Sequence, residues 1–138
     1  TKTDLPFVLE NDNAGQIQLS EFAKCKVPSY IATDDGSAGF KGFVTDAANK
    51  YIDENKLDPN TTIIYTCGPK PMLAACAKLA EKYGIDCQVS TERMMACGIG
   101  LCQSCAVETK IPGDSETVYK LCCKNGPVFD SKELVFSS

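Results

Sequence analysis

The sequence predicts an α/β fold, in which a parallel sheet with covering helices precedes a small cysteine-rich module. Between residues 27 and 92, short apolar runs alternate with helical patterns, and this alternation is typical of a parallel sheet. Beyond residue 93 the pattern changes to glycine and cysteine, in the run MACGIGLCQSC. We therefore expect two parts, a sheet domain over residues 1–92 and a compact module over residues 93–138.

The first half of the chain predicts one helix, one strand and a second helix. In residues 1–26 we expect a polar loop at 11–15 and then a short helix capped by Ser20. The run VPSYIATDDG, from residue 27, predicts a strand that ends in a turn. A helix is expected next, because apolar residues recur at helical spacing, namely Phe43, Val44, Ala47, Ala48, Tyr51 and Ile52.

The second half predicts a buried strand over residues 61–68 (TTIIYTCG), because the run is rich in β-branched and aromatic residues. A helix follows, with Pro71 in its first turn and Gly84 at its C-terminal end. Residues 85–93 (IDCQVSTER) predict a further strand. After the cysteine-rich loop we expect a hairpin formed by Cys105–Lys110 and Thr117–Leu121.

Composition excludes several classes of function. The net charge is −4 and the 14 basic residues are spread along the chain, so we expect no nucleic-acid partner. No apolar run approaches the length of a membrane span, so we expect no membrane partner. The nine cysteines without a visible secretory signal indicate a reducing, cytoplasmic location. With no histidine in the chain, Rieske ligation and histidine-containing zinc sites are excluded.

Four cysteines carry the main functional signal: Cys97, Cys102, Cys105 and Cys123, in the spacing C-x4-C-x2-C-x17-C. The order of the first three with a distant fourth is typical of plant-type [2Fe–2S] ligation. The glycines of the loop suit a backbone that wraps closely around a cluster. A protein with such a cluster transfers single electrons.

Two other uses of these thiols stay open. Disulfides are one, although the odd number of cysteines leaves at least one unpaired. A structural four-thiolate zinc site, in an interaction module without redox function, is the other. The adjacent Cys122 also competes with Cys123 for the fourth position. In an extended segment, neighbours point to opposite faces. We therefore choose Cys123, and expect Cys122 to pack as a small apolar residue.

Two predicted strand ends carry residues that suit a ligand, because open parallel sheets bind ligands beyond the carboxyl ends of their strands. These are the segments TDDGS at 33–37 and TCGPKPM at 66–72. Carboxylates at a strand end can hold ribose hydroxyls, and a helix N-terminus favours negative charge. The simpler interpretations are an ordinary turn at Asp34–Gly36 and a small buried side chain at Cys67.

The segments TDDGSAGFKGFVTD, YTCGPKPML and ERMMACGIGLCQSCAVE…LCCKNGPVF together resemble the ferredoxin-NADP reductase superfamily. Within it they resemble the family of dihydroorotate dehydrogenase B electron-transfer subunits, over roughly residues 27–135. The resemblance implies a partial nucleotide-binding domain of the reductase type with a C-terminal [2Fe–2S] module. It supports Cys123 as the fourth ligand, three residues before Gly126-Pro127. It also implies NAD contacts at Thr33, Asp34, Cys67, Gly68, Pro69 and Met72.

The resemblance further implies an oxidoreductase subunit that relays electrons between NAD(H), FAD and the cluster. Its partner would be a catalytic flavoprotein that oxidises dihydroorotate at an FMN, in pyrimidine biosynthesis. Related modules occur in NADPH–ferredoxin oxidoreductases, sulfide dehydrogenases and cytoplasmic hydrogenases, and these stay as alternatives. The flavin-binding barrel and the glycine-rich loop of the superfamily are not in this sequence. We therefore expect the chain to be a C-terminal fragment that is not fully active alone.

Overall fold

The computed structural model of the chain describes residues 8–11, 17–111, 113–114 and 116–136. By their internal contacts the residues form two units, residues 1–56 and residues 57–138, which are treated separately below. The division expected after residue 92, between a sheet domain and a cysteine-rich module, is one of function and not of contacts, and it stays a prediction. None of the helices in the described part of the chain is long and apolar enough to cross a membrane.

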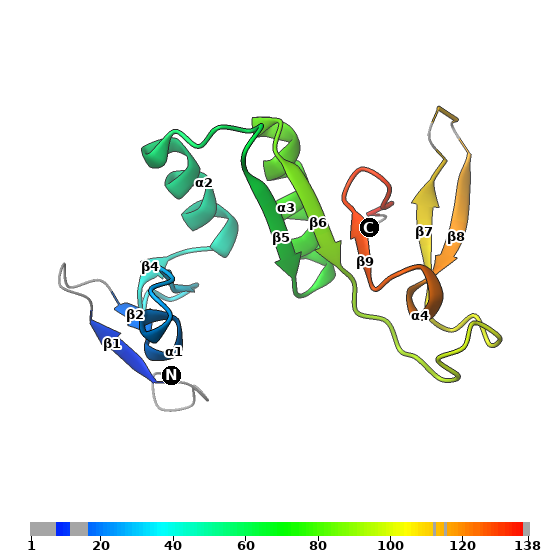
Figure 1. Ribbon diagram of the computed structural model, residues 1–138, viewed down its shortest axis with the longest axis horizontal. Helices are drawn as coiled ribbons and strands as arrows, with labels where there is room; N and C mark the ends of the chain where they lie inside the picture. Colours follow the sequence, from blue (N-terminus) through cyan, green and yellow to red (C-terminus); the bar gives the residue numbers. More distant parts are fainter. Residues whose placement is uncertain (1–7, 12–16, 112, 115, 137–138) are drawn as a thin grey trace. The chain divides into compact units, whose positions relative to one another are not determined.

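The first unit is built from two small pairs of strands and two helices (Figure 1). The predicted strand at residues 27–33 is shorter than expected, since only its last two residues, Ala32 and Thr33, are in strand conformation. Most of the predicted polar loop at 11–15 lies outside the described residues. The elements are β1 (Leu9–Asn11) antiparallel to β2 (Ile17–Leu19), α1 (Ser20–Lys24), β3 (Ala32–Thr33) parallel to β4 (Phe40–Lys41), and α2 (Val44–Asn55).

Both predicted helices of this unit are present, but their N-terminal ends differ from the prediction. Leu19 is the N-cap of α1 and Ser20 is its first residue, so Ser20 does not cap the helix as predicted. Its hydroxyl instead donates to the Glu21 carboxylate at 3.2 Å. Helix α2 begins after Phe43, which is exposed and does not share the apolar face.

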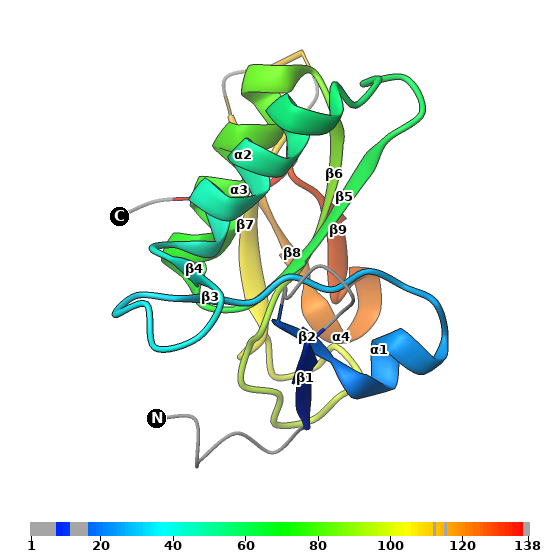
Figure 2. The ribbon, with the colours of Figure 1, turned by 90° about the vertical axis from the view of Figure 1, so that its left-hand side faces the viewer.

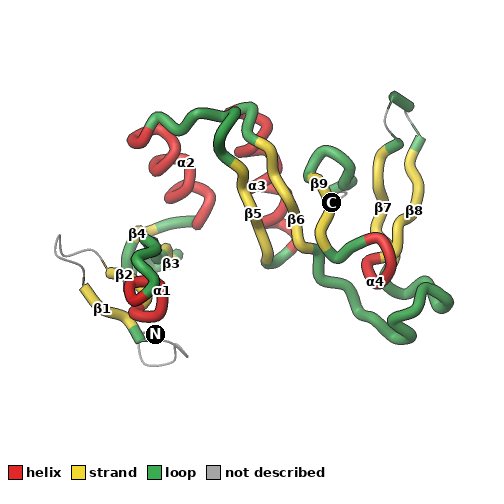
Figure 3. The backbone as a smooth tube through the Cα atoms, viewed as in Figure 1, coloured by secondary structure: helices red, strands yellow, loops and turns green. Residues whose placement is uncertain are grey.

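The second unit contains a three-stranded sheet with helix α3 (Lys70–Tyr83) against it (Figures 1 and 2). A hairpin and a short helix follow the cysteine-rich loop (Figure 3). The sheet has the order β5-β6-β9, in which β5 and β6 run parallel and β9 is antiparallel. The other elements are β5 (Ile63–Cys67), β6 (Asp86–Ser90), β7 (Ala106–Lys110), β8 (Thr117–Leu121), α4 (Cys122–Asn125) and β9 (Val128–Asp130).

Helix α3 has the predicted ends. Pro71 lies in its first turn, where no intrahelical partner is needed for the missing N–H. Gly84 ends it with φ 67° in the left-handed region, which glycine adopts without steric cost. The predicted hairpin is also confirmed, as Ala106–Lys110 pairs with Thr117–Leu121.

Strand β5 departs from the prediction of a buried strand. It lies at the edge of the sheet, and its outward side chains are exposed: Ile63 to 45% and Tyr65 to 73%. Only one face of the strand, at Ile64 and Thr66, is covered. The apolar composition therefore reflects an edge strand with one covered face.

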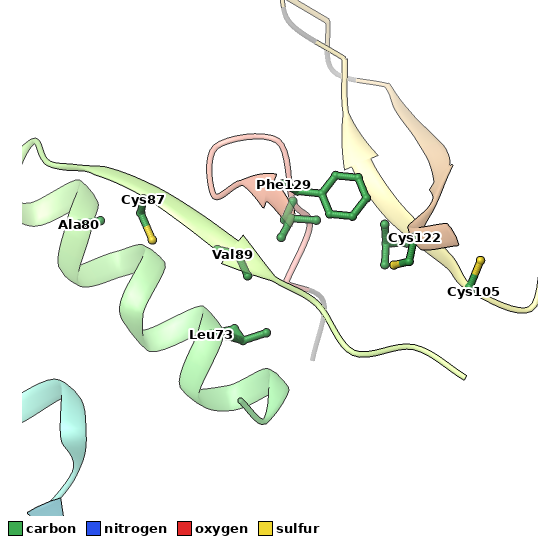
Figure 4. Packing of buried hydrophobic residues seen from close by; sticks show 9 residues of the cluster. Leu73, Ala80, Cys87, Val89, Cys105, Cys122 and Phe129 are labelled. Atoms are coloured by element: carbon green, nitrogen blue, oxygen red, sulfur yellow. The ribbon is translucent and has the colours of Figure 1, made fainter. Parts of the chain in front are cut away.

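The core of the second unit joins α3, the sheet and the hairpin (Figure 4). Each side chain in it is nearly or fully removed from solvent. Its members are Leu73, Ala80, Cys87, Val89, Cys105, Val107, Cys122, Phe129 and Leu134. Since this cluster includes Cys105 and Cys122, the core continues directly into the cysteine-rich region.

Candidate metal centre

The loop between β6 and β7 carries three of the four predicted ligands and has an unusual backbone (Figure 3). Gly98 and Gly100 have φ angles of 69° and 86°, in the left-handed region that glycine favours. Gln103 also has a positive φ, of 60°. The prediction of special backbone angles in this loop is thus confirmed.

Backbone N–H groups of the loop point at the sulfur of Cys97. The Cys102 N–H donates to Cys97 Sγ at 3.4 Å. This bond, followed by the N–H groups of Ile99 and Leu101, holds the pKa of the Cys97 thiol below its usual value. The donors stabilise the thiolate, the form that binds metals.

Cys102 is the most strongly activated thiol of the loop. The Ser104 hydroxyl lies 3.1 Å from Cys102 Sγ, and together with the Ser104 N–H it lowers the Cys102 pKa to about 6. A thiol with such a pKa is largely ionised at neutral pH.

Cys105 and Cys123 form a second pair of sulfurs. Cys105 is buried, and its thiol hydrogen-bonds Cys123 and raises the Cys123 pKa. The Gly100 N–H acts on Cys123 in the opposite direction, while Cys97 lies close enough to raise its pKa through charge. The four thiols thus occupy one region as the pairs Cys97–Cys102 and Cys105–Cys123. In the described residues, no three Cys, Asp or Glu side chains converge around a single point.

Cys122 faces a different environment from Cys123. The two residues begin α4, so the expectation of an extended segment is wrong. Their side chains nevertheless point in different directions, because successive residues are rotated about the helix axis. Cys122 is fully buried, and its Sγ lies 3.1 Å from Thr91 Oγ1. Figure 4 shows its sulfur on the side of Phe129, while the Cys105 sulfur points away from that side. All nine cysteines are free thiols.

Thr33 and Asp34, the first candidate nucleotide contacts, lie in the turn after β3. The Thr33 hydroxyl donates to the Ala38 carbonyl at 2.8 Å and accepts from the Ala38 N–H at 3.2 Å. The Asp35 carboxylate accepts from the Ser37 N–H, which lowers the Asp35 pKa. Asp34 is exposed. The predicted turn is therefore present, and both of its carboxylates, Asp34 and Asp35, are exposed.

The second set of candidates lies where β5 meets α3. Cys67 is exposed, so the interpretation as a small buried residue is wrong. Gly68 has a φ of 152°, and a Cβ there would collide with the methyl group of Met72. Pro69 is the N-cap of α3. Met72 thus packs over Gly68 at the start of the helix.

A cavity of about 490 Å³ adjoins this turn within the second unit. Sequence reasoning found Gly68 and Pro69 but missed most of its lining, since the other residues come from separate segments and share no motif. Lys70 and Arg93 bring positive charge to it, and Glu92 and Glu108 bring negative charge. Its lining comprises Gly68, Pro69, Lys70, Leu73, Thr91, Glu92, Arg93, Ala106, Val107, Glu108, Tyr119, Leu134, Val135 and Phe136.

The fold belongs to a known class of α/β proteins. A solved structure of an NADH-dependent reduced ferredoxin-NADP oxidoreductase superposes with a TM-score of 0.67 at 28% identity, covering 92% of this chain and 42% of that chain. The expected ferredoxin reductase-like fold is thereby confirmed. Its C-terminal part can be assigned more narrowly, because residues 92–135 match the family described as the iron–sulfur cluster binding domain of dihydroorotate dehydrogenase B.

Curated relatives agree with this assignment. The dihydroorotate dehydrogenase B (NAD(+)) electron transfer subunit of Caldanaerobacter subterraneus is 42% identical over 106 residues, which are 77% of this chain and 40% of that protein. That of Geobacillus thermodenitrificans is 45% identical over 78% of this chain and 37% of its own length. A probable counterpart from Methanocaldococcus jannaschii is 44% identical over 77% of this chain and 37% of its own.

The predicted relationship is therefore confirmed: residues 92–135 match this iron–sulfur domain family, and most of the chain is similar to electron transfer subunits of that enzyme. The matched part spans about two fifths of the length of these curated relatives.

Proposed function

We propose that this chain forms the cluster-bearing part of an oxidoreductase electron-transfer subunit, with a [2Fe–2S] cluster held by Cys97, Cys102, Cys105 and Cys123. The observation that carries the proposal is the arrangement of the loop around its sulfurs. Backbone N–H groups point at Cys97, Cys102 and Cys123, and the sulfurs lie in two pairs.

This arrangement suits the chemistry of the cluster. A [2Fe–2S] centre has four thiolates on two irons, and hydrogen bonds to the sulfurs stabilise their charge. The pairs Cys97–Cys102 and Cys105–Cys123 would each serve one iron. When bound, the cluster accepts and returns one electron at a time. The chain's own part is to hold four thiolates, to supply N–H donors and to keep Cys122 out of the site by burying it.

Nucleotide binding is the second part of the proposal, since the relatives carry NAD(+) in their names. We assign Thr33, Asp34, Cys67, Gly68, Pro69 and Met72 as contacts of NAD in the whole protein, which would also carry FAD. The start of α3 supports this assignment, because Gly68 and Pro69 line a cavity beside the N-terminus of this helix. On this division, residues 1–92 serve the nucleotide and residues 93–138 the cluster.

The partner we propose is a catalytic flavoprotein subunit that oxidises dihydroorotate at an FMN, in pyrimidine biosynthesis. The names of the curated relatives support it, since they are subunits of dihydroorotate dehydrogenase B. The five cysteines outside the proposed cluster site form no disulfide with one another, and this favours a cytoplasmic location, where thiols stay reduced. A second candidate is a subunit of an NADPH–ferredoxin oxidoreductase, which the superposed oxidoreductase favours.

The test is anaerobic reconstitution of the full chain with iron and sulfide. We expect two irons and two sulfides per chain, visible absorption, and an electron paramagnetic resonance signal after reduction. A colourless protein that instead takes up one zinc per chain would contradict the proposal. Adding either a dihydroorotate-oxidising flavoprotein or a ferredoxin to the reduced chain separates the two candidates, because only the true partner is reduced rapidly.

A further inference from the structure

The side chain of Ser104 has three polar neighbours inside the cysteine loop. Its hydroxyl oxygen lies 3.1 Å from Cys102 Sγ, 3.3 Å from the Met94 carbonyl oxygen and 3.4 Å from the Ala96 nitrogen. The Ala96 N–H donates to this oxygen, so the hydroxyl proton is left for either Cys102 or Met94. Which of the two receives it depends on the state of the Cys102 sulfur.

Metal ligation decides the direction of the Ser104–Cys102 bond. With a free thiol, either group could be the donor. A cysteine that binds iron does so as a thiolate and has no proton to give. In the loaded protein, therefore, the Ser104 hydroxyl is the donor and the Cys102 sulfur is the acceptor. The 3.1 Å separation is already suitable for that bond.

We infer that Ser104 sets the reduction potential of the cluster by donating a hydrogen bond to the Cys102 sulfur. This inference rests on the proposed function and adds a residue outside the four ligands. Reduction adds a negative charge to the cluster, so a donor to sulfur stabilises the reduced form more than the oxidised form. The hydroxyl therefore raises the potential, and its removal lowers it.

The bond is expected to have a moderate effect. A hydrogen bond to a charged acceptor contributes about 1.5–3 kcal/mol, but only the part that strengthens on reduction changes the potential. Ser104 is also exposed, so water competes for the sulfur. We expect Ser104→Ala to lower the equilibrium constant for reduction about fivefold, which is about 40 mV at 59 mV per tenfold change for one electron.

The experiment is a redox titration of the full chain with its reconstituted cluster, followed by visible absorption and electron paramagnetic resonance. Ser104→Ala is compared with Ser104→Thr, which keeps the hydroxyl and should stay within about twofold of the parent. Gln103→Asn is the matched control in the same C-x2-C gap. Asparagine tolerates the positive φ of Gln103, and no described hydrogen bond of its side chain is changed.

The outcomes separate this inference from the proposed function. If the parent takes up no cluster, the proposed function fails. If the cluster forms and Ser104→Ala stays within about twofold of the parent, or Ser104→Thr falls equally far, Ser104 does not act through its hydroxyl. Because Ser104→Ala could also release Met94 and Ala96 and fail to load iron, the isosteric pair Ser104→Thr and Ser104→Val gives a second comparison. They should differ by about fivefold, and equal potentials would overturn the inference.

Discussion

The two adjacent cysteines at the start of α4 should respond in opposite ways to substitution. Cys123→Ser removes one of the four proposed ligand thiolates, so the protein should lose most of its iron and its visible absorption. Cys122→Ala should keep both, because the Cys122 side chain is fully buried in the core and hydrogen-bonded to Thr91, and is not one of the proposed ligands. Cys122→Ala should instead lower the free energy of unfolding.

The size of that loss follows from the surroundings of Cys122. The substitution removes a buried group of about methylene size, which costs about 1 kcal/mol with its residual cavity. It also removes the hydrogen bond between Thr91 Oγ1 and Cys122 Sγ, worth about 1 kcal/mol. The Thr91 hydroxyl keeps a second partner, the Pro127 carbonyl at 3.1 Å, so it is not left unsatisfied. The sum is about 2 kcal/mol, or a fall in Tm of roughly 8 °C.

The assay is iron and sulfide analysis together with thermal unfolding, on both variants and the parent after identical reconstitution. The ligand assignment is refuted if Cys122→Ala loses the cluster while Cys123→Ser retains it. If Cys122→Ala retains the cluster but melts at the parent's temperature, the account of the core around Cys122 is wrong instead.

Three further substitutions and treatments test the fold and the loop. Phe129→Ala should cost about 3 kcal/mol of unfolding free energy, seen as a lower denaturant midpoint, because Phe129 is buried between the sheet and α4. Gly84→Ala should cost about 1 kcal/mol through its left-handed φ alone, since nothing crowds that position, and an unchanged midpoint would refute the strain. In the metal-free chain, the lowered Cys102 pKa means that alkylation, mapped by mass spectrometry, should be half-maximal near pH 6 and fall below it. Cys87, whose burial raises its pKa, should stay unlabelled across that range.

The elements that were predictable from sequence are those whose ends are marked by residues nearby in the chain. Helix α3 has Pro71 at its start and Gly84 at its end, and both act within one turn of the helix. The hairpin of β7 and β8 needs only neighbouring residues to pair. The spacing of Cys97, Cys102 and Cys105 likewise falls within one loop, which explains why the sequence alone predicts a candidate site there.

The missed features depend on contacts between distant segments. Strand β9 is three residues long and exists because Val128–Asp130 pairs with β6. The exposure of Tyr65 depends on what packs against its face of the sheet, and no local pattern reports that. The lining of the cavity is gathered from segments with no shared motif, so Arg93 and Tyr119 could not be found from sequence alone.

The pairing of β9 with β6 has a consequence for how the second unit folds. Val89 lies opposite Phe129, and Thr91 bonds to Pro127, 36 positions along the chain. Closing so long a loop costs conformational entropy before any contact forms, and such contacts slow folding. The β7–β8 hairpin lies inside this loop and can form on the microsecond scale from local contacts. We therefore expect the hairpin to form first and to shorten the open chain, and β9 to complete the sheet afterwards.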